Sequence, residues 1–564
     1  MQGGLIMNKK PLVLLLALSM VVSTSLSSCG TKKPTTSKTN LGNASDGPFT
    51  KYKEPVTVNI AFMGSDVTTG RSPKDTVDDN VWIRSIKEDL NIDIKVLWTV
   101  NGVDNYKTKL NLAIASNALP DIISTSNYTQ FDKLLTNDKI EDLTQYYNKY
   151  AYPKFKQWYT EDGGIMKSWG TVDGKMMGIS NGGVLYDSTR MVHIRHDWFV
   201  KTGLPKPKTM NDVIDIAKAF KADDPTRYGF TMDKTIIGEG EGDLVGFANA
   251  FGVYPRTWNK DASGKIIYGS IQPGMKDVLS TVADLYKDKL IDPEFAVKTG
   301  MQVAEQLTSG KVGVILGNFW LESWPLPDLY KAKNVDWDVY PLMPMASNTG
   351  DFKVQTDPTQ GAMITVRKGF AHPEAAFKIM NYEASKLNDP DKADTAKFHS
   401  DDKYSYFGWG PISLELSPLK VNFDTQVNVT NAIDKNDESY LKTPHDKLQY
   451  KAVKAYVDAV AAGTKPDQND WGMYKFFYGE NSTFGVQNTY FKNNSYLSSV
   501  IAGYETPEMA RKKSTLENLE DTAFIEIITG KKPLNSFDAF VAQWNELGGK
   551  TITSEVNTWY KNKK

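Results

Sequence analysis

Cys29 is the only cysteine in the 564-residue chain, and its position points to a defined covalent chemistry. It follows an apolar run over 12–22 and the small residues 26–28, and two lysines precede the run. The run is too short to cross a bilayer as a helix and has the flanks of an export signal. We therefore interpret residues 1–28 as a signal peptide that takes no part in the fold.

A second group of residues could bind a ligand that carries hydroxyl groups and rings. Ser65 and Asp66 follow one predicted strand, and Asn127 and Tyr128 follow another. Short polar side chains in such loops can make paired hydrogen bonds to vicinal hydroxyls, although Asp66 and Asn127 could equally be turn-forming residues. The chain also has 13 tryptophans and 27 tyrosines, whose faces can stack on rings, although core packing is the default for any single one.

Alternating strand and helix patterns would place these loops together. Residues 56–62, 92–98 and 121–123 have strand spacing, and the two segments between them have helical spacing. This order predicts an open, mainly parallel sheet with helices on its faces. Ligands bind at the carboxyl ends of the strands in such sheets, where these loops lie.

The bulk composition excludes several classes of protein. Lys and Arg (66) nearly balance Asp and Glu (67), so no strong field favours nucleic acid. One cysteine allows no internal disulfide, so stability must come from core size, which the length permits. Residues 29–55 are rich in Thr, Ser, Lys, Asn, Gly and Pro, and we expect a lipidated N-terminus with a flexible tether.

Leu-Ser-Ser-Cys at 26–29 resembles the lipobox of bacterial lipoproteins. The resemblance implies that Cys29 becomes the N-terminus and carries a diacylglyceryl group, with acyl chains such as palmitate. Two acyl chains anchor a protein more firmly than one, because membrane affinity grows by roughly 0.8 kcal/mol per buried CH₂. We expect the protein on the extracellular face of the cell membrane.

Several further segments resemble family 1 extracellular solute-binding proteins, and in particular the large oligosaccharide-binding lipoproteins of Gram-positive bacteria. No single motif is decisive, but their order and spacing are specific. The segments are Pro120–Ile123, Asp173–Ile179, Ile194–Trp198, Ser309–Trp320, Asp338–Leu342 and Phe537–Tyr560.

The resemblance implies a two-lobed α/β fold of the periplasmic-binding-protein type II, with the ligand cleft between the lobes. We expect residues 56–183 and 336–400 in an N-lobe, and 184–335 and 401–564 in a C-lobe. The chain would change lobes near 181–186, near 336–341 and again near residue 400.

The resemblance also implies site residues. Trp320 occupies the position where related sugar binders place a stacking tryptophan, the alternative being interlobe core. Trp409, in an aromatic Gly-rich loop, is a second candidate platform, unless the loop is buried. Glu322 and Gln360 are further candidates.

Three other patterns receive a structural interpretation. Gly178–Gly182 fits the G-x-S-x-G nucleophile pattern but lacks the strand-to-helix context, so we interpret it as a lobe-crossing segment. His193 and His196 have metal-ligand spacing, but the resemblance assigns them no such role. Residues 259–264 imitate half a calcium loop, and we expect a hairpin turn there. We predict no metal and no cofactor.

The sequence thus predicts a monomeric, lipid-anchored, carbohydrate-binding subunit that delivers an oligosaccharide to the transmembrane subunits of an ABC importer. It would bind by hinge closure and catalyse nothing. Two alternatives stay open: an extracellular glycan-active enzyme and a sugar-sensing co-receptor.

Overall fold

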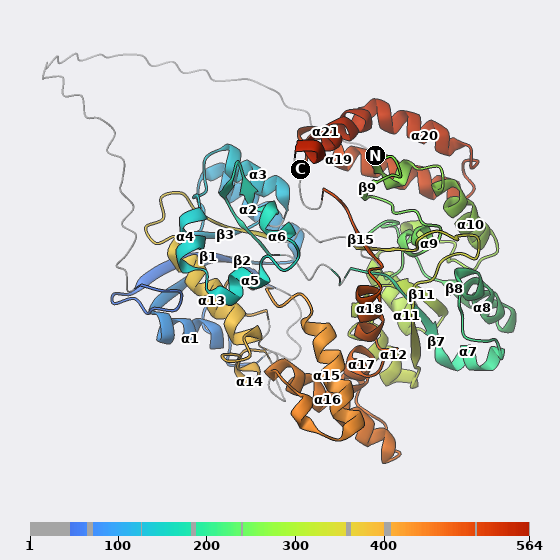
Figure 1. Ribbon diagram of the computed structural model, residues 1–564, viewed down its shortest axis with the longest axis horizontal. Coiled ribbons are helices and arrows are strands. Elements are labelled where there is room, and N and C mark those ends of the chain that lie inside the picture. Colours follow the sequence, from blue (N-terminus) through green and yellow to red (C-terminus); the bar gives the residue numbers. More distant parts are fainter. Residues whose placement is uncertain are drawn as a thin grey trace, which may run out of the picture. The chain divides into compact units, whose positions relative to one another are not determined.

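The computed structural model describes residues 46–562 apart from 65–71, 126, 182–185, 187, 239–240, 357–361, 400–405, 407, 415 and 502–504. Strands and helices alternate over the first two thirds of this range and build two lobes, each with three sheets of its own (Figure 1).

The N-lobe comprises the described residues of 47–181 and 362–416. Its strands are β1 (Val56–Gly64), β2 (Ile92–Asn101), β3 (Ile122–Ser124), β4 (Thr171–Val172), β5 (Lys175–Met176), β6 (Ile179–Asn181) and β14 (Ala362–Val366). Its helices are α1 (Val81–Leu90), α2 (Val103–Ser116), α3 (Tyr128–Thr136), α4 (Thr144–Tyr150), α5 (Pro153–Trp158), α6 (Ile165–Trp169), α13 (Glu374–Asn388) and α14 (Thr395–Phe398).

The predicted β-α-β-α-β order at the start of the N-lobe is confirmed. β1 and β2 pair in parallel over their whole length, with α1 and α2 packed against β2 (Figure 1). β14 lies between β3 and β6 and runs antiparallel to both. The carboxyl ends of β3 and β6 therefore lie at the same edge as the amino end of β14.

Asp121 joins the two groups of N-lobe strands. Its backbone N–H donates to the Asn59 carbonyl of β1 at 2.8 Å. Its Oδ2 accepts from the backbone N–H and the Nδ2 of Asn59 at 2.9 and 2.7 Å. Its Oδ1 lies 2.6 Å from an Arg367 guanidinium nitrogen, directly after β14. One buried carboxylate thus connects β1, β3 and the segment after β14.

The last residues of the predicted tether pack on the N-lobe instead. Phe49 and Tyr52 lie against its core, and Lys378 donates to the carbonyls of Gly47 and Thr50 at 2.9 and 2.7 Å. The prediction of a flexible tether up to residue 55 is wrong for these residues, because the aromatic rings bury apolar surface. Residues 1–45, including Cys29, lie outside the described residues.

The C-lobe comprises the described residues of 190–356 and 420–562. Its strands are β7 (Met191–Arg195), β8 (Tyr228–Phe230), β9 (Trp258–Lys260), β10 (Ile266–Tyr268), β11 (Val312–Gly317), β12 (Trp337–Pro341), β13 (Val354–Thr356) and β15 (Tyr496–Ser498). Its α-helices in the first part are α7 (His196–Thr202), α8 (Met210–Asp223), α9 (Leu244–Ala250), α10 (Met275–Lys287), α11 (Gly300–Thr308) and α12 (Leu326–Lys333).

The second part of the C-lobe is mostly helical. Its α-helices are α15 (Val421–Lys435), α16 (Pro444–Ala461), α17 (Gln468–Phe477), α18 (Thr483–Lys492), α19 (Pro507–Ile528), α20 (Ser536–Trp544) and α21 (Lys550–Asn562), with a π-turn at Asn545–Gly549 before α21. Short 3₁₀ turns lie at Gly269–Ile271, Phe295–Val297, Phe319–Glu322 and Glu438–Tyr440.

The central sheet of the C-lobe is buried on both faces. Its strand order is β12-β7-β11-β8, with β7 antiparallel to both neighbours and β8 parallel to β11. Val314 and Leu316 of β11 face the core formed with α8 and α9, whereas Ile315 joins a second cluster with α11 and α12. All six residues of β11 are buried.

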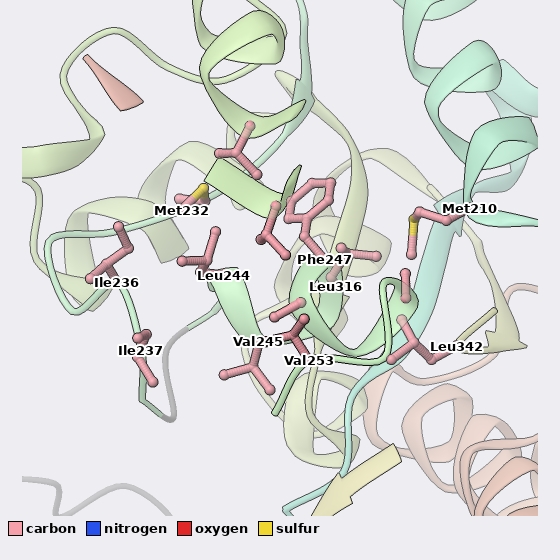
Figure 2. Packing of buried hydrophobic residues seen from close by; sticks show 14 of the residues in the cluster. Met210, Met232, Ile236, Ile237, Leu244, Val245, Phe247, Val253, Leu316 and Leu342 are labelled. Atoms are coloured by element: carbon pink, nitrogen blue, oxygen red, sulfur yellow. The ribbon is translucent and has the colours of Figure 1, made fainter. Parts of the chain in front are cut away.

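Figure 2 shows part of this core, where Phe247 of α9 lies beside Leu316. The helix can approach the sheet because residue 246 is glycine. A Cβ added there would lie 2.8 Å from the Cβ of Leu316. Close packing of α9 on β11 therefore depends on the missing side chain.

The chain changes lobes at three places. The first lies between β6, which pairs with β14 of the N-lobe, and β7, which pairs with β11 of the C-lobe. The second lies between β13, which pairs with β15 of the C-lobe, and β14, which pairs with β3 of the N-lobe. The predicted return at 336–341 is wrong, because β12 in that segment pairs with β7 of the C-lobe.

The third change lies at 417–420, later than predicted. Trp409, Ile412, Leu414 and Leu416 all pack in the N-lobe core with β1, so the described residues of 406–416 belong to the N-lobe and not to the predicted C-lobe. The apolar side chains of this loop have no helical or strand spacing in the sequence. They are buried in the N-lobe core, before the chain continues into the C-lobe.

A buried carboxylate holds this loop on the N-lobe. Glu383 of α13 accepts the backbone N–H groups of Ile412 and Leu414, each at 2.9 Å, with its two carboxylate oxygens. Burial raises the pKa of Glu383 to about 7, against the opposing effect of these amide donors. We name this contact the Glu383 clamp.

We predict that Asp121→Ala lowers the free energy of unfolding by about 2–3 kcal/mol, because two Asn59 donors and Arg367 lose their acceptor. Asp93→Ala is the matched control, since its partner Lys87 is exposed, and should change stability by less than about 0.5 kcal/mol. Urea denaturation measures both values. Equal losses in the two variants would contradict the role of Asp121.

We predict that Glu383→Gln weakens the pH dependence of stability. The folded-state pKa of Glu383 lies above its ordinary value of 4.5, so its contribution is complete below about pH 4.5 and is lost as pH rises through about 7. Glutamine imitates the protonated carboxyl. Wild type should therefore lose on the order of 1–3 kcal/mol more than the variant between about pH 4.5 and 8. Urea denaturation of both proteins across this range tests it; parallel curves would rule it out.

Candidate functional site

An exposed tryptophan pair lies at the carboxyl end of β11. The strand ends at Gly317 and continues into the turn Phe319–Glu322. The rings of Trp320 and Trp324 stack at 6.1 Å between centroids and 25° between planes. Trp324 is 37% exposed and Trp320 is partly buried, so the pair presents aromatic surface to solvent.

The residues around this pair hold it in place. Phe319 packs against Phe476 and Phe484 of the helical part of the lobe, and Leu321 is fully buried. A Cβ added to Gly472 of α17 would lie 2.4 Å from the carbonyl oxygen of Glu322, so the helix touches the turn backbone. The tryptophan pair is thus fixed on a packed support.

Glu322, between the two tryptophans in the sequence, is fully buried. Its Oε1 lies 2.9 Å from Nδ1 of His193 on β7, at an angle outside the range of a hydrogen bond. This placement argues against the prediction that Glu322 contacts a ligand. Along the turn, Phe319 and Trp320 are half-buried, whereas Leu321 and Glu322 are fully buried.

The N-lobe edge contains two further predicted residues. Asn127 is the N-cap of α3, and its Oδ1 accepts the backbone N–H of Gln130 at 3.0 Å. Tyr128 is partly buried and its ring lies 5.6 Å from that of Phe131. Asn127 therefore has the local structural role that the sequence left open, and both residues follow the carboxyl end of β3.

Trp409 is 6% exposed and stacks on Phe62 of β1 at 6.3 Å. Trp409 is therefore buried, which is the alternative to a ligand-stacking role that the sequence left open. The same loop, held by the Glu383 clamp, reaches the end of β6, where Asn181 Nδ2 donates to the Ser413 carbonyl at 2.9 Å. The sequence analysis missed Glu383, which lies among the buried residues of α13.

The remaining predicted site residues, Ser65, Asp66 and Gln360, lie outside the described residues. Within the part of the chain that the structure describes, no group of three acidic, histidine or cysteine side chains could hold a metal ion. His193 is buried on β7, and His196 contacts Asp338 at 2.9 Å. In the same part of the chain, every helix is too short or too polar to cross a bilayer.

Comparison with known proteins gives a consistent result. Residues 76–386, more than half of the chain, match the family model described as bacterial extracellular solute-binding protein. Lipoprotein LipO of Bacillus subtilis is 24% identical over 511 residues, which cover 87% of this chain and 91% of that one. The polygalacturonan/rhamnogalacturonan-binding protein YtcQ of the same organism is 22% identical over 564 residues, covering 99% and 100%.

Solved structures show the same fold. An extracellular solute-binding protein from Bifidobacterium longum subsp. infantis has a TM-score of 0.61 at 17% identity, covering 90% of this chain and 98% of that one. The alginate-binding protein AlgQ2 has a TM-score of 0.57 at 15% identity, covering 92% and 100%. The predicted two-lobed α/β fold class is confirmed, and the chain belongs to the bacterial extracellular solute-binding proteins.

Proposed function

We propose that the protein binds an oligosaccharide in a cleft between its lobes and delivers it to the transmembrane subunits of an ABC importer. The observation that carries the carbohydrate assignment is the stacked Trp320–Trp324 pair at a strand end of the C-lobe. Stacked indoles offer a broad apolar face for sugar rings, and their N–H groups can donate to hydroxyls. The ends of the sheet strands are where ligands bind in this class of fold.

The named relatives support the same assignment. YtcQ is described as binding polygalacturonan and rhamnogalacturonan. FusA of Streptococcus pneumoniae, 26% identical over 288 residues, is described as a fructooligosaccharide ABC transporter substrate-binding protein. This match covers 48% of the present chain and 50% of FusA.

The proposed mechanism uses the three changes of lobe as a hinge. A ligand that contacts both lobes only when they close shifts the equilibrium toward the closed form, and the importer distinguishes that form. The protein alters no bond of the sugar and acts as a monomer without a cofactor. In this proposal Tyr128, together with Ser65, Asp66 and Gln360 of the undescribed segments, supplies further hydrogen bonds to the sugar.

Anchoring through Cys29 completes the proposal. The lipid holds the protein at the extracellular face of the membrane, next to the importer, which raises its local concentration there. The apolar run and small residues before Cys29 support this assignment.

We predict that Trp320→Ala and Trp324→Ala each reduce the affinity for the cognate oligosaccharide by at least about tenfold, or 1.4 kcal/mol. A thermal-shift screen finds that sugar first, since a ligand at 100 times its Kd stabilises the protein by about 2.7 kcal/mol. Trp559→Ala, outside the tryptophan pair, is the control and should keep the full shift. If both pair variants keep the wild-type shift, the tryptophans are not in the site; if the sugar is returned cleaved, the protein is an enzyme.

We predict that Cys29→Ser moves the protein from the membrane fraction to the medium of the host cell, because no thiol remains for lipid attachment. Ser28→Ala leaves the thiol in place and should stay membrane-bound. Cell fractionation and immunoblotting measure the distribution. Membrane retention of the serine variant would exclude Cys29 as the anchor.

A further inference from the structure

The last helix of the C-lobe, α21, has a row of polar residues on the face that lies toward the β9–β10 hairpin. Its residues are spaced by three and one along α21, which places them on one side of the helix. With the β9–β10 hairpin and the turn after it, they line a groove of about 690 Å³. The residues of α21 in this groove are Lys550, Thr553, Ser554, Asn557, Thr558 and Lys561.

The groove has a fixed shape. Asn557 accepts the Ile266 backbone N–H with Oδ1 at 2.9 Å and donates to the Ile266 carbonyl with Nδ2 at 2.8 Å, as a neighbouring strand would. Tyr268 stacks on Trp544 at 5.0 Å and 10°, and its hydroxyl donates to the buried Glu520 at 3.1 Å. The hairpin and the two last helices therefore form one packed unit.

The unmatched charge in the groove is positive. Lys265, Lys550 and Lys561 line it, and its walls carry no acidic side chain. The charge of Lys265 helps to lower the pKa of the exposed Asp261, which does not line the groove. Three like charges around one depression favour an anion there.

Most other polar groups of the groove are already engaged. Thr553 donates to the Gly549 carbonyl at 2.8 Å, and Thr558 to the Ser554 carbonyl at 2.9 Å. Gln272 Nε2 donates to the Tyr268 carbonyl at 2.8 Å. The lysine amines are thus the groups with the strongest remaining capacity to bind a ligand.

The dimensions indicate an extended ligand. Lys550 and Lys561 are eleven residues apart on α21, so their backbones lie about 16 Å apart along the helix. A single small anion cannot contact both. A flat bilayer does not fit a concave groove, whereas a chain of acidic sugars can follow it and place carboxylates at intervals.

We propose that this groove is a second carbohydrate site, which binds an anionic, uronic-acid-bearing oligosaccharide through Lys265, Lys550 and Lys561. Ammonium–carboxylate hydrogen bonds supply the attraction, which weakens as salt screens it. The site lies entirely on C-lobe elements and shares no lining residue with the Trp320–Trp324 pair. It holds acidic glycan independently of the site proposed above.

The test is calorimetric titration at low salt with an oligogalacturonate and with its methyl ester of equal length. Wild type should bind the acid at least about tenfold more tightly than the ester. The variant K265E/K550E/K561E should lose this preference, and K265Q/K550Q/K561Q should lose most of it with little effect on folding. The control K201E/K206E/K287E changes the same net charge at exposed lysines outside the groove and should keep the preference.

Repeating the titration with Trp320→Ala separates this site from the proposed transport site. Acid preference that survives in this variant and depends on the three groove lysines supports the second site, whatever the outcome for the transport ligand. The proposal is overturned if the preference disappears with Trp320→Ala, if the control variant loses it equally, or if anionic vesicles bind through these lysines and the oligogalacturonate does not.

Discussion

Burial of the C-lobe sheet on both faces is the constraint from which the candidate site follows. β11 contacts one core through Val314 and Leu316 and another through Ile315, so it can neither slide nor rotate without exposing apolar side chains. Its carboxyl end is therefore fixed, and the turn that follows must place Trp320 beside Trp324. A strand with one solvent face would tolerate more movement at this edge.

Charged groups inside the protein serve to join segments distant in the sequence. Asp121 connects β1, β3 and Arg367, and Glu383 holds the loop that carries Trp409. Each carboxylate accepts several donors, which offsets the cost of removing it from water. In a chain without disulfides, such contacts and a large apolar core define how the returning segments dock.

Two of the three predicted lobe boundaries are wrong, and both errors have the same physical cause. β12 has the pattern of any buried strand, and only its pairing with β7 assigns it to the C-lobe. Likewise, the apolar residues of 409–416 could pack on either lobe, and they pack on β1. Hydrophobic periodicity identifies an element and its buried face but does not name the partner that covers it.

The sequence by itself determined the β-α-β-α-β order of the first N-lobe elements, the hairpin turn at 259–264 and the likeness to solute-binding proteins, because these depend on neighbouring residues and on spacing. It also identified Trp320 as a residue of a strand-end turn. Only the tertiary structure decided that Trp324 stacks on Trp320, that Glu322 and Trp409 turn into the core, and that three lysines meet in one groove. The burial of Glu322 and Trp409 and the meeting of Lys265 with α21 depend on contacts between residues far apart in the chain, and the Trp320–Trp324 stack depends on the turn conformation, neither of which local spacing predicts.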